Sequence, residues 1–383
     1  MPRIDKLPPY LFSAIDAARD RAIAQGVDVV DLGVGDPDRP TPESLVDVAA
    51  ASVRTPSNHR YPAGRGDSQL RRAIAGFMRR RHGVDVDPDH EVLVLLGSKE
   101  GIAHLPLSLV EEGDNVLVPD IGYPVYTQSA ILAGAEPRPF RLSADRAFLP
   151  DLDELRALAD DRTRLCWLNY PNNPTGAEAG EGLYGPLAAL ARERGLVLAN
   201  DAAYLEVSLD QHRPVSLLEA VDHKKNRVVE FHSLSKMFNM TGWRVGFAVG
   251  HPDLIAGLAR VKESIDSGAF TAVQQVATFA LGRGADQLLA EVMEPYPERR
   301  RIMVDALKMA GITVFPTQAT FYVWARCPEG ESSLDFCARV LQQHGVVVTP
   351  GTGFGTGGEG WFRISLTAAD ERIQAAAERL GSL

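Results

Sequence analysis

The sequence predicts an α/β protein with a large domain built on a mainly parallel sheet and a smaller α+β domain. Between residues 46 and 280, short apolar runs typical of strands alternate with segments of helical periodicity, which is the pattern of a parallel sheet with crossover helices. Helices and strands also alternate after residue 280, over a shorter stretch. With 383 residues and 45% hydrophobic content, the chain can bury more than one compact core.

The first 45 residues are predicted to form an arm with a helical stretch near 11–25 and a loop that contains Gly33 and Gly35. We expect this arm to pack with the C-terminal part of the chain. Residues 1–45 and 281–383 would then make up the small domain, and residues 46–280 the large domain.

Polar residues follow several predicted strands of the large domain. The strands are expected at 92–96, 165–168, 196–199 and 228–231, with helices at 66–82 and 183–194 among the connections. The segments that follow the four strands are 97–101, 169–176, 200–204 and 233–244. Because ligands of open parallel sheets bind outside the carboxyl ends of the strands, we expect these four segments to meet at one site.

The small domain is expected to contain helices at 285–310 and 333–344 and strands at 313–315, 319–325, 346–348 and 361–366. The glycine-rich stretch 351–360 contains no G-x-G-x-x-G motif and opens no evident helix, so it is interpreted as a flexible active-site loop.

The most informative segment is 233–247, where Lys236 follows a predicted strand and lies among hydroxyl groups and an arginine. A lysine amine can condense with an aldehyde, while Ser233, Ser235 and Arg244 can bind a phosphate. Ser233 and Lys236 also match the S-x-x-K motif of serine acyl-enzymes, but the companion tripeptides S-D-N and K-T-G do not occur in the chain. The phosphate-linked chemistry is therefore favoured.

Four motifs together resemble those of the pyridoxal 5′-phosphate-dependent class I and II aminotransferases of fold type I. They are N-P-T-G at 173–176, D-A-A-Y at 201–204, S-L-S-K at 233–236 with Arg244, and F-R-I-S at 362–365. Each motif alone would be an ordinary turn, strand or cap, and the resemblance depends on their order and spacing. Segments 31–42, 97–104, 122–126, 167–176, 231–246 and 348–355 are most similar to bacterial LL-diaminopimelate aminotransferases. Ile121 and Arg39 depart from that pattern, and Arg39 is expected to add charge near the entrance of the site.

The resemblance implies a seven-stranded sheet, pyridoxal phosphate as cofactor, and a homodimer with shared active sites. It implies transfer of an amino group between an L-amino acid and a 2-oxo acid by a ping-pong mechanism, with LL-2,6-diaminopimelate and 2-oxoglutarate as the substrates, in lysine biosynthesis. The same motifs would also suit an alanine, aspartate or aromatic aminotransferase, or a lyase of the same fold.

The resemblance also implies a role for each site residue. Lys236 would carry the amine and then the proton, and Asp201 would keep the ring nitrogen protonated. Asn173 and Tyr204 would bind the ring oxygen, and Tyr123 would stack on the ring. The phosphate would be held by Ser98, Lys99, Ser233, Ser235, Arg244 and a partner subunit's tyrosine at the position of Tyr61, and the substrate by Arg363, Asn173 and Gly35. For Lys99, Tyr123 and Tyr204, a structural role is the open alternative.

Composition argues against several other classes of protein. The net charge is −10 and the basic clusters 79–81 and 299–301 are short, which does not suit a nucleic-acid partner. The sequence begins without the apolar core of a signal peptide, and no run approaches the roughly 18 apolar residues of a membrane span. Three unpaired cysteines suit reduced thiols in the cytoplasm, and nine scattered histidines without a ligand motif predict no metal site.

Overall fold

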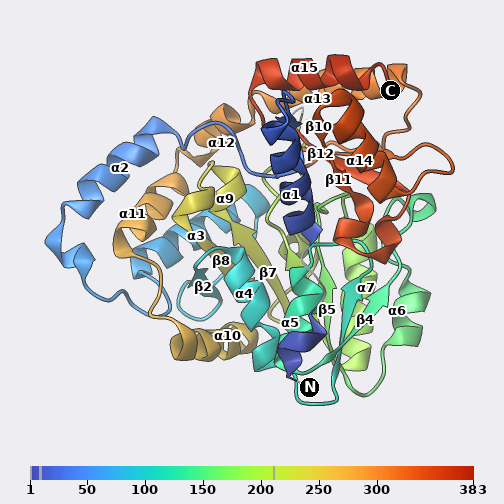
Figure 1. The fold of residues 1–383 in the computed structure, drawn as a ribbon. Helices are drawn as coiled ribbons and strands as arrows, with labels where there is room; N and C mark the ends of the chain where they lie inside the picture. Colours follow the sequence, from blue (N-terminus) through green and yellow to red (C-terminus); the bar gives the residue numbers. More distant parts are fainter. Residues whose placement is uncertain (1, 8–10, 210–211) are drawn as a thin grey trace.

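The computed structural model describes residues 2–7, 11–209 and 212–383, and a seven-stranded sheet lies at its centre (Figure 1). The strand order is β2-β8-β7-β6-β5-β3-β4. The strands are β2 (Val92–Leu95), β3 (Asn115–Pro119), β4 (Glu136–Phe140), β5 (Thr163–Leu168), β6 (Val197–Asp201), β7 (Val228–Ser233) and β8 (Gly246–Gly250). Strands β4, β3, β5, β6 and β7 run parallel, whereas β8 is antiparallel to both of its neighbours. The predicted mainly parallel sheet is confirmed.

Helices cover both faces of this sheet, which is why its strands are apolar on both sides. One face packs against α4 (Ser98–His104), α5 (Val125–Ala133) and α10 (Pro252–Ile265). The other packs against α3 (Ser68–His82), α7 (Glu181–Arg194) and α11 (Thr271–Ala280). Strand β7 shows the alternation, because Val229 and Phe231 belong to the first core and Val228 to the second. Further helices are α2 (Glu43–Val53), α6 (Leu152–Leu158), α8 (Leu217–Ala220) and α9 (Leu234–Met237).

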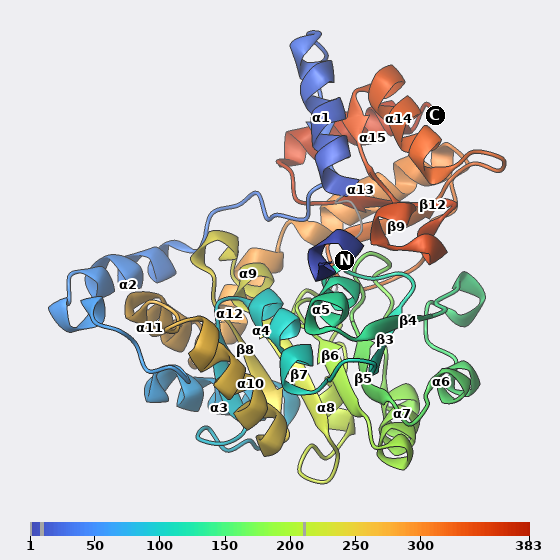
Figure 2. The ribbon, with the colours of Figure 1, turned by 60° about the horizontal axis from the view of Figure 1, so that its bottom comes forward.

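The C-terminal part of the chain has its own hydrophobic core. An antiparallel sheet of order β11-β12-β9 packs with α13 (Tyr296–Met309), α14 (Ser333–His344) and α15 (Asp370–Leu380). Its strands are β9 (Tyr322–Arg326), β11 (Thr349–Pro350) and β12 (Trp361–Ser365). The N-terminal arm lies with this part: β1 (Val30–Asp31) pairs in parallel with β10 (Val346–Val347), and α1 (Leu11–Ala24) lies beside the C-terminal helices (Figure 2). The division into two domains at the stated residues stays a prediction.

Two of the predicted elements differ in the structure. The helix predicted over 285–310 is interrupted at Pro295, which has no backbone N–H to continue a helix, and becomes α12 (Ala285–Met293) and α13. The strand predicted at 313–315 is reduced to a single bridge between Val314 and Ala325. Among the described helices, none is both long enough and apolar enough to cross a membrane.

Candidate active site

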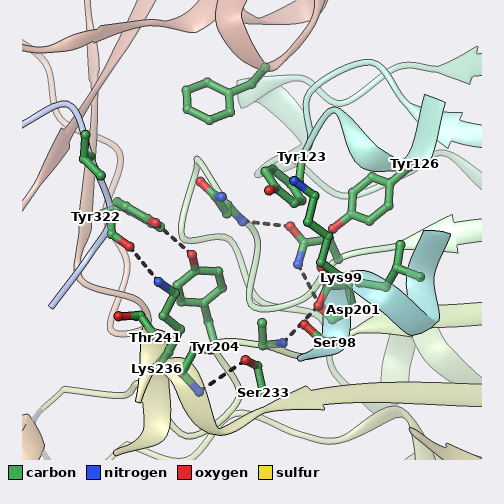
Figure 3. A pocket seen from close by; sticks show the side chains of 18 of the residues that line it. Ser98, Lys99, Tyr123, Tyr126, Asp201, Tyr204, Ser233, Lys236, Thr241 and Tyr322 are labelled. Atoms are coloured by element: carbon green, nitrogen blue, oxygen red, sulfur yellow. Dashed lines mark hydrogen bonds between the residues drawn. The ribbon is translucent and has the colours of Figure 1, made fainter. Parts of the chain in front are cut away.

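A cavity of about 420 Å³ lies at the carboxyl ends of the parallel strands, where they meet the C-terminal part of the chain (Figure 3). The structure brings all but one of the predicted site residues to this cavity: Gly35, Ser98, Lys99, Tyr123, Asn173, Asp201, Tyr204, Ser233, Ser235, Lys236, Arg244 and Arg363. The exception is Tyr61, which does not line the cavity and is 89% exposed.

One end of the cavity collects donors suited to a phosphate. Ser98 begins α4 directly after β2, and Ser233 and Ser235 lie where β7 turns into α9. Arg244 approaches Gly97 so closely that a Cβ on this glycine would lie 2.4 Å from Arg244 Nη2. Gly97 also has a φ of 78°, a conformation that favours glycine, and an added Cβ would displace the guanidinium of Arg244.

Lys236 lies deep in the cavity on α9, and its Nζ donates to the carbonyl of Gly35 at 2.7 Å. Burial lowers the pKa of Lys236 to about 8, with smaller contributions from the positive charges of Arg363 and Arg244, while Asp36 opposes the change. A lysine with this pKa supplies far more neutral, nucleophilic amine near neutral pH than a surface lysine does.

Asp201 ends β6 and is 5% exposed. Its Oδ2 accepts from the hydroxyl of Tyr126 at 2.8 Å, and its Oδ1 accepts from the backbone N–H of Ala203 at 3.2 Å. Burial raises the pKa of Asp201 to about 6, and these two hydrogen bonds oppose the rise. Such a carboxylate is ready to pair with a positive charge brought to it by a bound ring nitrogen.

Arg363 reaches the opposite end of the cavity from β12 and is 3% exposed. Its Nη1 donates to Oδ1 of Asn173 at 2.8 Å and its Nη2 to the carbonyl of Gly33 at 2.6 Å. The guanidinium is stacked between two rings, with Cζ 4.2 Å from the centre of Tyr322 and 4.7 Å from that of Phe354. Its buried Nε has no hydrogen-bond partner in the described part of the chain, so the group keeps a donor for an incoming carboxylate.

Tyr204 and Tyr123 occupy the space between these two ends. The hydroxyl of Tyr204 lies 2.7 Å from that of Tyr322, in a buried pair. Tyr123 is half-buried, and the Nζ of Lys99 lies 5.3 Å above its ring while the Lys99 residue itself is exposed. The structure thus gives Lys99 a contact with the predicted stacking ring.

The structure adds detail to two expectations about the surroundings of the site. Arg39 is not among the residues that line the cavity, and its guanidinium pairs with Glu294 at 2.8 Å and Asp370 at 3.6 Å, while its effect near the entrance stays a prediction. The glycine-rich stretch 351–360 folds as two short 3-10 turns, at 351–354 and 356–358, and largely buries its first turn. It thereby places the ring of Phe354 against Arg363.

Sequence reasoning missed Tyr322 and Phe354 as members of the site, and it connected the stretch from Tyr126 to Ser129 with substrate specificity without giving Tyr126 a role of its own. Tyr126 lies three residues after Tyr123, in the first turn of α5, so the helix that follows β3 could have suggested it. Tyr322 lies beside Arg363 on the same small sheet, two residues away diagonally across the β9–β12 pair. No local pattern marked Phe354.

The residues present fit pyridoxal phosphate. Serine hydroxyls and Arg244 offer a phosphate site at strand and helix ends, and the guanidinium of Arg244 packs against Gly97. A buried carboxylate and a half-buried amine of lowered pKa line the cavity, and a buried guanidinium with an unpaired Nε closes its other end. One cavity therefore contains groups that can bind a phosphate, pair with a ring nitrogen, react with an aldehyde and bind a carboxylate.

Comparison with known proteins gives consistent results. The family described as aminotransferase class I and II matches residues 27–380. An LL-diaminopimelate aminotransferase of Aquifex aeolicus is 46% identical over 381 residues, covering 100% of this chain and 98% of the relative. One of Desulforudis audaxviator is 47% identical over 378 residues, covering 99% and 96%. Among solved structures, a probable N-succinyldiaminopimelate aminotransferase from Thermus thermophilus has a TM-score of 0.90 at 36% identity, covering 97% of this chain and 100% of that one. A Thermus thermophilus aspartate aminotransferase double mutant has a TM-score of 0.93 at 28% identity, covering 100% and 98%.

Proposed function

Because the chain belongs to the class I and II aminotransferases, and is thus a pyridoxal-phosphate-dependent aminotransferase, we propose that it transfers an amino group from LL-2,6-diaminopimelate to 2-oxoglutarate. The support for this substrate pair is the full-length identity of 46–47% to curated relatives that bear the name LL-diaminopimelate aminotransferase. The place of the reaction would be lysine biosynthesis. The observation that carries amino-acid recognition is the buried Arg363, stacked between two rings with its Nε unpaired.

When bound, pyridoxal phosphate supplies an aldehyde that takes up the amino group and a ring that withdraws electrons from the substrate Cα. Ser98, Ser233, Ser235 and Arg244 would hold its phosphate. The carboxylate of Asp201, whose pKa burial raises to about 6, would keep the proton on the ring nitrogen, and that positive charge would return the pKa of Asp201 toward its ordinary value. Asn173 and Tyr204 would donate to the ring oxygen.

Lys236 acts as the proton carrier of the reaction. Its free amine removes the proton from Cα of the amino acid, and it returns a proton there in the second half-reaction. In the cofactor-free protein the lowered pKa of about 8 already leaves a useful fraction of Lys236 neutral. The two substrates use the same cavity in turn, so the kinetics are ping-pong.

Arg363 would fix the orientation of the amino acid. A guanidinium that pairs with the α-carboxylate holds Cα in place and decides which of its bonds faces Lys236. Its bonds to Asn173 and Gly33 restrict its movement before the substrate arrives.

We also propose a cytoplasmic homodimer in which Tyr61 of one subunit completes the phosphate site of the other. The support is the placement of Tyr61, since a tyrosine that is 89% exposed and outside its own cavity is free to reach a neighbouring subunit. The three cysteines form no disulfide, which suits a reducing compartment.

A half-reaction screen tests the substrate. The yellow holoenzyme is mixed with single amino acids, and conversion to the aminated cofactor is followed by absorbance. The panel contains LL-diaminopimelate, its N-succinyl derivative, glutamate, aspartate, alanine and phenylalanine. Rapid conversion by LL-diaminopimelate and glutamate alone supports the proposal, whereas preference for the N-succinyl derivative, aspartate, alanine or phenylalanine would replace it.

A further inference from the structure

Tyr322 touches two groups that the reaction needs and has no role in the proposed function. It lies on β9 and is 2% exposed. Its hydroxyl lies 2.7 Å from that of Tyr204, and its ring face lies 4.2 Å from Cζ of Arg363. Figure 3 shows Tyr322 and Tyr204 side by side, with their hydroxyls joined by this hydrogen bond.

The N-terminal arm packs closely against the hydroxyl of Tyr322 at Gly35. A Cβ on Gly35 would lie 1.9 Å from the hydroxyl oxygen of Tyr322, so only glycine fits there. The carbonyl of the same Gly35 accepts from Nζ of Lys236. The position of the Tyr322 hydroxyl is therefore fixed between the arm and Tyr204.

The hydroxyl pair has a direction once the cofactor is present. A phenol has one hydrogen to donate, and either oxygen of the pair can be the donor. If Tyr204 donates to the ring oxygen, its own oxygen must accept from Tyr322. The positive charge of Arg363 over the Tyr322 ring favours this order, because it makes the Tyr322 hydroxyl a better donor.

We propose that Tyr322 is a positioning residue with two actions. Its hydroxyl donates to Tyr204 and so directs the hydrogen of Tyr204 toward the ring oxygen, while its ring supports the guanidinium of Arg363. The hydroxyl chain strengthens the bond from Tyr204, since each donor in such a chain polarises the next. This inference rests on the proposed placement of Tyr204 against the ring oxygen.

The hydroxyl is tested by the pH titration of the visible absorbance of the holoenzyme. A hydrogen bond donated to the ring oxygen draws negative charge away from it, so this oxygen holds the proton that it shares with the neighbouring nitrogen less tightly. Loss of the donor therefore raises the apparent pKa of that shared proton. Tyr204→Phe should raise it by roughly 1 or more, and Tyr322→Phe by roughly 0.5 to 1. The double variant should match Tyr204→Phe alone, because Tyr322 acts through Tyr204. Tyr296→Phe, in the same aromatic cluster but outside the cavity, is the control and should titrate like the wild type.

The outcomes separate the two assignments. If Tyr204→Phe leaves the titration unchanged, the placement of Tyr204 in the proposed function is wrong. If Tyr204→Phe raises the pKa but Tyr322→Phe does not, or if the two effects add in the double variant, only the role of Tyr322 is overturned.

The ring is tested by the binding of a dicarboxylate inhibitor to the holoenzyme. Tyr322→Phe keeps the ring beneath Arg363 and should change the dissociation constant by less than about twofold, whereas Tyr322→Leu should raise it roughly tenfold. Folding of Tyr322→Leu is checked by its cofactor content. Equal affinity in the Phe and Leu variants would overturn the support of Arg363 by the ring.

Discussion

Burial shifts the pKa values of two ionisable groups in the cavity in opposite directions, and both shifts favour the neutral form of the group. The pKa of Lys236 falls to about 8 and that of Asp201 rises to about 6. For Lys236 the neutral form is the reactive one, so the structure prepares it before any ligand binds. In the proposed function Asp201 acts in its ionised form, which the positive ring nitrogen would restore.

The lowered pKa of Lys236 predicts how the cofactor-free protein takes up pyridoxal phosphate. Only the neutral amine attacks the aldehyde, so the rate should rise roughly tenfold between pH 7 and pH 9 and then level off. An ordinary lysine would give roughly a hundredfold rise that continues above pH 9. Stopped-flow absorbance measures the rate, and a rise without a plateau up to pH 10 contradicts the lowered pKa.

Asp201→Asn keeps the shape of the side chain but removes its charge. The half-reaction should slow by roughly 100-fold or more for every amino acid, since a buried positive ring nitrogen loses its partner. The ranking of amino acids should not change. Asp120→Asn is the matched control, because Asp120 is a carboxylate at the end of another strand and lies outside the cavity. If both variants slowed the half-reaction equally, the effect of Asp201→Asn would not be specific to the ring nitrogen.

Arg363→Ala should lower kcat/KM for α-amino acids but leave the slow reaction with a simple primary amine nearly intact. Loss of a buried charge-assisted pair costs on the order of 2–5 kcal/mol, which is roughly a 30- to several-thousand-fold effect. Arg326→Ala removes an exposed arginine from the same small sheet and should have little effect. If Arg363→Ala slowed both kinds of substrate equally, Arg363 would be a structural residue.

At the scale of elements, the site depends on how β2 turns into α4. Gly97 occupies this turn with a φ of 78°, and Arg244 lies against it. Gly97→Ala should therefore weaken the binding of pyridoxal phosphate roughly tenfold or more, because Arg244 must move. Gly83→Ala is a matched control, since Gly83 has a φ of 67° and nothing within 4 Å of an added Cβ. It should cost about 1 kcal/mol of stability and leave cofactor affinity unchanged, and equal affinity losses would reject the steric argument.

The elements also show why part of the site could be predicted and part could not. Lys236, Asp201 and Asn173 follow parallel strands that are visible as apolar runs, and one rule gathers their ends. Tyr322 and Phe354 come from a strand and a loop whose position against the cavity depends on tertiary packing, and no local spacing encodes it. Strand β8 is separated from β7 only by the short helix α9 and a turn, and it is antiparallel to both of its neighbours. The alternation of strands and long crossover helices therefore does not predict it.

For the molecule as a whole, the arm, the sheet and the C-terminal part meet at the cavity. The arm supplies the carbonyls of Gly33 and Gly35, which accept from Arg363 and Lys236. The guanidinium of Arg363 in turn donates to Asn173 on the loop after β5. Arg363 and Lys236, the proposed substrate clamp and proton carrier, are therefore tied to the same short segment of the arm. The remaining part of the proposed site, the phosphate contact of Tyr61, would have to come from a second subunit.

Mixing two inactive or weakened variants tests this shared site. Lys236→Ala should have no turnover, and Tyr61→Ala should bind the cofactor poorly because a phosphate contact is lost. In a mixed dimer, one of the two sites combines Lys236 of one subunit with Tyr61 of the other and is intact.

After the two variants are unfolded and refolded together at equal concentrations, about a quarter of all sites should regain wild-type behaviour if subunits pair at random. Activity at limiting pyridoxal phosphate should then rise well above the mean of the two variants. A mixture that stays at that mean would show that Tyr61 does not act across the dimer, and each variant refolded alone provides the baseline.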